Sequence, residues 1–141
     1  MMLALDVNVL VAAFHTGAPD HERMRGWVEA AVNGGEAVGV SEAVAAGVVR
    51  VLTHPRVFDP PARLEDALER VEALLAHPNV AVLTPAPGHW AVLAELCRQA
   101  DARGNLVSDA AHAATAIQHN ATFVTRDRDF ARFPGLRWRA P

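Results

Sequence analysis

Residues 1–14 read MMLALDVNVLVAAF and hold a single acidic residue, Asp6, between two apolar runs. The first run predicts a buried strand over 2–6, and the second predicts a short helix over 9–14 with Asn8 as its N-cap. Asp6 would then lie where a buried strand ends, and a carboxylate at the edge of a core is costly unless something neutralises it. Because ligands of open α/β sheets bind at the carboxyl ends of the strands, Asp6 marks a candidate site.

The rest of the chain alternates between expected helices and strands. Further strands are expected at 37–40, 80–83 and 122–124, with a last short one at 136–138. Helices are expected at 21–32, 42–53, 64–75, 88–102 and 108–119, with Trp90, Leu93 and Cys97 facing inward and Ser108 as the last N-cap. This alternation predicts an α/β fold with a mainly parallel sheet and helices on both faces. The length of 141 residues and the lack of a linker predict one domain over 1–141.

Composition excludes several classes of function. All 13 basic residues are arginine, so the chain has no lysine for a P-loop or for the phosphoryl group of a phospho-receiver domain. The net charge is −3, so a nucleic acid would have to bind a local patch. Cys97 is the only cysteine and predicts no internal disulfide. With no signal-peptide pattern and no apolar run of about 18 residues, we expect a cytoplasmic protein without a membrane span.

Three acidic residues follow or begin apolar elements. Asp6 and Asp127 come at or just past the ends of predicted strands, and Asp109 lies in the first turn of an alanine-rich helix. In a parallel sheet these positions share one rim, where three carboxylates repel each other unless a cation neutralises them. Mg²⁺ and Mn²⁺ favour such oxygen donors and support hydrolysis of phosphodiesters. The three acids together predict a shared metal site.

Each acid also has a purely structural interpretation. Asp6 could belong to a turn, Asp109 could be a first-turn acid that the helix dipole favours, and Asp127 could be a solvated turn residue. Seven histidines are present, but none has the spacing of a zinc site. His112 lies one turn after Asp109, where it would line the pocket or, as we favour, pack on the surface.

Four segments resemble PIN-domain ribonucleases in the order typical of that family. The segments are LDVNVL (5–10), RVLTHPRVF (50–58), VSDAAHAATA (107–116) and FVTRDRDF (123–130). The second of them is similar to a stretch common in VapC-type toxins of bacterial toxin–antitoxin pairs. Each motif alone is weak, but the four together cover nearly the whole chain.

The resemblance implies a three-layer α/β/α sandwich and a Mg²⁺- or Mn²⁺-dependent endoribonuclease that cleaves RNA. It also implies a homodimer and a cognate VapB-like antitoxin. By the same resemblance, Asp6, Asp109 and Asp127 would be metal-binding catalytic acids. Asn8 and Thr125 would orient them through hydrogen bonds.

The third helix departs from the family pattern. The family usually has a glutamate three residues before the position of Arg50, and here that position is Gly47. Either Glu42 reaches the site from the first turn and joins the catalytic acids, or the site has three carboxylates. The alternative function is a catalytically weak or inactive PIN-like module that binds RNA or protein without cleavage.

Arginines are concentrated near the last predicted strands. Arg126 and Arg128 flank Asp127, and we favour contacts between them and RNA phosphates over simple pairing with neighbouring aspartates. For Arg137 and Arg139 we favour an ordinary surface role.

Overall fold

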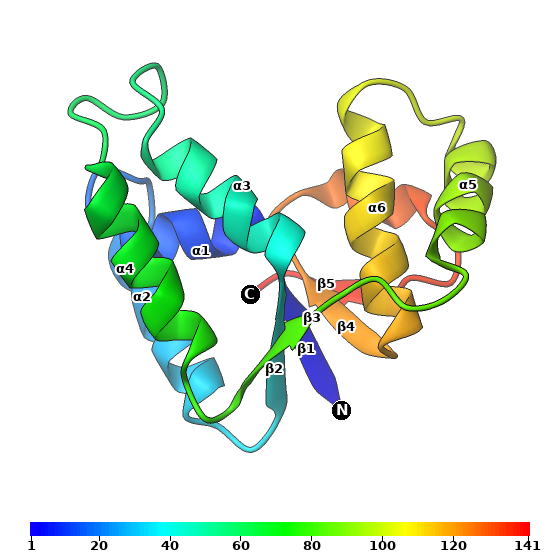
Figure 1. The fold of residues 1–141 in the computed structure, drawn as a ribbon, viewed down its shortest axis with the longest axis horizontal. Helices are drawn as coiled ribbons and strands as arrows, with labels where there is room; N and C mark the ends of the chain where they lie inside the picture. The colour runs from blue at the N-terminus through cyan, green and yellow to red at the C-terminus, as the bar shows by residue number, and fades with distance from the viewer.

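The computed structural model describes residues 1–141 and has a parallel five-stranded sheet at its centre (Figure 1). The strands are β1 (Met2–Leu5), β2 (Ala37–Ser41), β3 (Val80–Leu83), β4 (Ala121–Val124) and β5 (Trp138–Arg139). Their order in the sheet is β3-β2-β1-β4-β5, and every neighbouring pair is parallel. The mainly parallel sheet that the alternating pattern predicted is therefore confirmed, and β1 lies at its centre.

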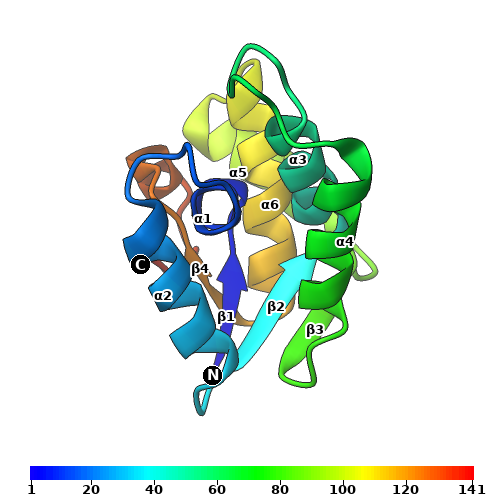
Figure 2. The same ribbon diagram turned by 90° about the vertical axis from the view of Figure 1, so that its left-hand side faces the viewer.

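Helices cover both faces of the sheet. The helices are α1 (Val7–Phe14), α2 (His21–Val32), α3 (Glu42–Leu52), α4 (Leu64–Leu75), α5 (His89–Ala100) and α6 (Asn105–Gln118), with a 3₁₀ turn, η1, at Arg128–Arg132. Figures 1 and 2 show α1 to α4 on one side of the sheet and α5 and α6 on the other. The α/β/α sandwich implied by the resemblance is confirmed. None of the helices is long and apolar enough to cross a membrane.

The two apolar cores follow from the alternation of side chains along β1. Leu3 and Leu5 belong to the core beneath α1 to α4, whereas Ala4 belongs to the core beneath α5 and α6. This separation is the period-two alternation of a strand that is buried on both faces. On the second face, α6 contributes four buried alanines, and small side chains let it lie close against β4.

Three details of the predicted helices are wrong. Trp90 is 75% exposed, because α5 packs on α6 rather than on the sheet and buries only Leu96 fully. The next helix begins at Asn105, directly after Gly104 at φ 58°, so Ser108 is not its cap and Asp109 lies in its second turn.

The third correction concerns the first helix. It begins at Val7, and its N-cap is Asp6, whose carboxylate accepts a hydrogen bond from the Val7 amide at 2.7 Å. Asn8 therefore does not cap the helix. Its side chain is free to reach the neighbouring strand.

Candidate active site

The register of the sheet places Asp6 beside Thr125. Leu5 pairs with Val124 in the parallel ladder between β1 and β4, so the next residue of each strand leaves the sheet at the same point. The Thr125 hydroxyl donates a hydrogen bond of 2.6 Å to Asp6 Oδ2. Both side chains are buried. The predicted orienting contact of Thr125 is thus present in the structure.

Asn8 extends this network. Its side-chain amide donates to the Thr125 hydroxyl at 3.3 Å, and its carbonyl oxygen accepts from the Arg126 amide at 3.1 Å. The Asp127 amide also donates to the Thr125 hydroxyl, at 3.0 Å. The start of α1 and the segment after β4 are therefore fixed to each other by side chains of both.

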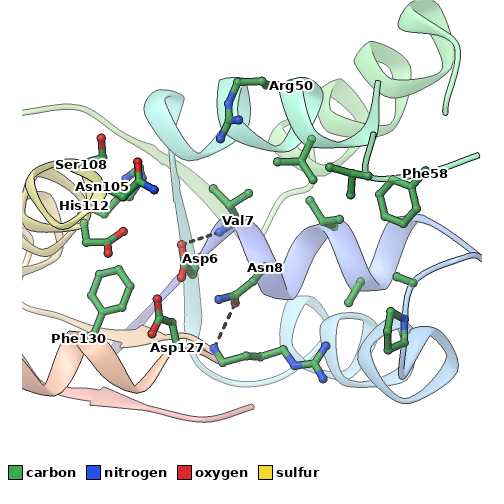
Figure 3. A pocket seen from close by; sticks show the side chains of 18 of the residues that line it. Asp6, Val7, Asn8, Arg50, Phe58, Asn105, Ser108, His112, Asp127 and Phe130 are labelled. Carbon is green, nitrogen blue, oxygen red and sulfur yellow. Dashed lines mark hydrogen bonds between the residues drawn. The ribbon is translucent and has the colours of Figure 1, made fainter. Parts of the chain in front are cut away.

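A groove of about 670 Å³ opens in front of this network. Asp6, Asp109 and Asp127 all line it. Figure 3 shows Asp6 and Asp127 together with residues of α6 at one end and Phe58 at the other. The fold thus brings the three predicted acids to one groove at the carboxyl ends of β1 and β4.

Burial and mutual repulsion raise the pKa of Asp6 and of Asp109. Burial, followed by the charges of Asp127, Asp6 and Asp129, raises the pKa of Asp109 to about 6. Burial also raises the pKa of Asp6, although hydrogen bonds from Thr125 and Val7 act in the opposite direction. No arginine forms an ion pair with Asp6, Asp109 or Asp127. The groove therefore concentrates negative charge that the chain itself leaves uncompensated.

The carboxylates do not yet form a coordination sphere. No three His, Cys, Asp or Glu side chains lie close enough to hold a metal ion as they stand. The donor set nevertheless fits a hard divalent cation, because the groove presents three carboxylates with Asn105 and Ser108 beside them. Repulsion among the acids is what such a cation would relieve.

The structure does not bring Glu42 to this groove. Ser41 caps α3 by accepting a hydrogen bond from the Val44 amide at 3.0 Å, and Glu42, the next residue, is exposed and does not line the groove. There is also no room for a side chain at Gly47, the position of the family's usual glutamate. A Cβ at Gly47 would lie only 2.9 Å from Cγ2 of Val7.

Two further residues line the groove. His112, for which the sequence analysis favoured a place on the surface, faces it from α6; its Nδ1 is buried without a hydrogen-bond partner, and burial lowers its pKa. Arg50, which the sequence did not single out, faces it from α3 and makes no ion pair (Figure 3). Helical spacing is the signal that could have found Arg50 too, because it is one turn from Gly47.

The predicted phosphate-binding arginines lie at the edge of the groove. Arg126 lines it and forms an ion pair with Asp20 at 3.0 Å. Arg128 lies just outside, in an adjacent hollow that Arg126 also lines. Neither arginine pairs with Asp127 or Asp129, which was the structural alternative.

The α/β/α sandwich is the part of this arrangement that solved structures share with the chain. The family model described as PIN domain matches residues 3–136. The chain therefore belongs to the PIN-domain family. Within this family it falls among the VapC ribonucleases, as its individual relatives show.

The chain is 44% identical over 140 residues to VapC ribonuclease Mb2897 of Mycobacterium bovis, covering 99% of this chain and 95% of the relative. It is 38% identical over 136 residues to ribonuclease VapC25 of Mycobacterium tuberculosis, with 96% of each chain covered. Among solved structures it resembles VapBC2 from Rickettsia felis, described as bound to a DNA fragment from its promoter. That match has a TM-score of 0.74, 19% identity, and covers 99% of this chain and 98% of the other. Another is Mycobacterium tuberculosis VapC20, a sarcin-ricin loop cleaving toxin, with a TM-score of 0.69, 18% identity and coverage of 96% and 98%.

Proposed function

We propose that Asp6, Asp109 and Asp127 are the metal-binding catalytic acids of this VapC ribonuclease and that Mg²⁺ or Mn²⁺ is its cofactor. The observation that carries the proposal is their convergence on one groove, where burial and the charges of the neighbouring acids raise the pKa of Asp109 to about 6 and no arginine forms an ion pair with them. A bound divalent cation would supply an activated water and charge stabilisation for hydrolysis of an RNA phosphodiester. Glu42 has no part in this site, which we propose holds three acids.

The chain's own residues would position these acids. Thr125 and Asn8 hold the Asp6 carboxylate and the backbone of Asp127 in one network, so the Asp6 carboxylate is oriented before any ligand arrives. Arg126 lies beside the acids on the groove wall, where its guanidinium could bind a phosphate of the RNA strand. We propose the same role for Arg128.

As a VapC ribonuclease toxin, the chain is neutralised by a VapB-type antitoxin. The solved neighbours from Rickettsia felis and Salmonella typhimurium are VapBC complexes. We propose that an arginine of the antitoxin occupies the groove, because the uncompensated acids there would attract a guanidinium group as they attract a metal. We also propose that residues 1–141 form one domain, that the protein is a homodimer, and that it cleaves RNA in the cytoplasm.

Calorimetric titration with Mn²⁺ tests the metal site. Wild-type protein should bind Mn²⁺, and an Asp6→Ala/Asp109→Ala variant should lose that binding. A Glu65→Ala/Asp66→Ala variant is the matched control, because it removes two exposed acids from the first turn of α4. Undiminished binding in the first variant would overturn the proposal.

Cleavage separates the enzyme from the alternative of an inactive module. A structured RNA incubated with protein and Mn²⁺ should be cut, EDTA should stop the reaction, and Asp109→Asn should abolish it. Binding of the RNA without cleavage would favour the inactive RNA-binding module. This alternative arises because the chain has Gly47 where the family usually has a glutamate.

A further inference from the structure

Four arginines line a hollow of about 470 Å³ beside the acidic groove. Arg23 comes from α2, Arg126 and Arg128 follow β4, and Arg139 ends β5. Trp138 also lines the hollow but is half-buried, because it packs against the core beneath α5 and α6. Because these residues come from both ends of the chain, the hollow exists only in the folded protein.

Most of the positive charge in this hollow has no counterion. Asp20 accepts from Arg23 at 3.4 Å and from Arg126 at 3.0 Å, so one carboxylate serves two guanidinium groups. Arg128 and Arg139 form no ion pair, although the chain as a whole has a net charge of −3. Unpaired guanidinium groups gathered around one hollow favour an anion, and their planar donors match phosphate oxygens.

The hollow adjoins the acidic groove. Arg126 lines both, and Thr125, which lines the hollow, donates its hydroxyl to Asp6 on the other side. A ligand that occupies both spaces would pass over Arg126. It would present one charged group to the acids, through a cation, and a second to the arginines.

We propose that this arginine hollow binds the RNA strand next to the bond that is cleaved, with Arg128 and Arg139 on its phosphates. A single strand of RNA has this chemistry, since a positively charged surface that follows the backbone is a usual feature of single-strand binding. The inference rests on the proposed function for the identity of the ligand as RNA. It gives Arg139 a role in binding in place of the ordinary surface role that the sequence favoured.

Fluorescence anisotropy with a labelled oligouridylate, measured in EDTA across a range of salt concentrations, tests the proposal without cleavage. Arg139→Gln should weaken binding and lower the slope of log affinity against log salt by about 0.7, the value for one lost phosphate contact on a single strand. Arg128→Gln/Arg139→Gln should lower the slope by about twice as much and weaken binding about tenfold at low salt. Arg128→Lys/Arg139→Lys should restore the slope, because it keeps the charge.

Arg137→Gln is the matched control. Arg137 lies two residues before Arg139 and is equally charged, but its guanidinium is bound to the carbonyl and side-chain oxygens of Asn120, each at 2.8 Å. This variant should bind the oligouridylate with the salt slope of the wild type. An equal loss of RNA affinity in Arg137→Gln and Arg139→Gln would overturn the proposal, because the loss would then follow from the change in net charge alone.

Two further results separate this inference from the metal site. Arg128→Gln/Arg139→Gln should keep the Mn²⁺ binding of the wild type, so loss of RNA binding alone would support the hollow. Unchanged RNA binding in that variant would overturn the inference even if the metal site is confirmed. Loss of affinity for an acidic peptide with unchanged RNA binding would also overturn it, and would make the hollow a protein-docking site.

Discussion

The Thr125 hydroxyl donates to the Asp6 carboxylate over 2.6 Å and joins residues that are 119 positions apart in the chain. Thr125 has no exposed surface and Asp6 is 5% exposed, so the contact is shielded from water. The same hydroxyl accepts from the Asn8 side chain and from the Asp127 amide. One small side chain thus binds the carboxylate of Asp6 and the backbone of Asp127.

Replacing Thr125 with valine should destabilise the metal-free protein by about 1–3 kcal/mol, because a buried carboxylate oxygen loses its donor at almost unchanged volume. It should also weaken Mn²⁺ binding, since Asp6 loses part of its orientation. Urea unfolding and calorimetry would measure the two effects. Thr125→Ser keeps the hydroxyl and should retain Mn²⁺ affinity; equal losses of affinity in both variants would contradict the role given to the hydroxyl.

Asp109→Asn should stabilise the metal-free protein near neutral pH while abolishing cleavage. The pKa of Asp109 is raised to about 6 in the folded state, above the value of about 4 in an unfolded chain. The ionised form is therefore disfavoured by folding, and stability falls as pH rises between these two values. Asparagine removes this dependence.

Thermal unfolding in EDTA as a function of pH checks this prediction. The variant should have the higher melting temperature near neutral pH, and the difference should vanish below about pH 4, where Asp109 is neutral in both states. A lower melting temperature for Asp109→Asn near neutral pH would show that the folded protein does not disfavour the ionised form of Asp109.

Gly47→Glu should not by itself restore the family's fourth acid. Its Cβ would lie 2.9 Å from Cγ2 of Val7, and the stiff valine side chain cannot turn away easily. We expect a loss of about 1–3 kcal/mol in stability from overpacking. The Val7→Ala/Gly47→Glu double variant should recover most of this loss and bind Mn²⁺ more tightly than Val7→Ala alone. Full stability of Gly47→Glu would argue against the proposed clash.

Glu42→Gln should leave both cleavage and Mn²⁺ binding unchanged, because Glu42 is exposed and lies outside the groove. The neighbouring Ser41→Ala should cost about 1 kcal/mol in stability through loss of the α3 cap. Kinetic assays and urea unfolding of the two variants would distinguish a catalytic from a structural role of this turn. A large loss of kcat in Glu42→Gln would restore Glu42 to the site.

The elements that depend on short segments of sequence were predicted well. The apolar runs at 2–6, 37–40, 80–83 and 122–124 predicted all four principal strands, since strands of a parallel sheet that are buried on both faces are nearly continuous apolar segments. The edge strand β3 has the same apolar character, although Ala81 and Val82 are exposed. The helix at 64–75 has the bounds that its periodicity indicated. The predictions were wrong where tertiary packing decides between several structures that are locally possible. Trp90 is exposed because α5 packs against another helix. Asp6 caps α1 because the strand ends one residue earlier than predicted.

The sequence by itself determined the alternating α/β order, the residue types at the strand ends and the resemblance to PIN-domain ribonucleases, because each depends on short segments. Only the tertiary structure decided which of these side chains meet. The parallel register of β1 and β4 brings Thr125 to Asp6, the bulk of Val7 closes the place above Gly47, and Arg23 joins Arg139 around one hollow. Such contacts depend on register and packing between distant segments, which local patterns do not specify.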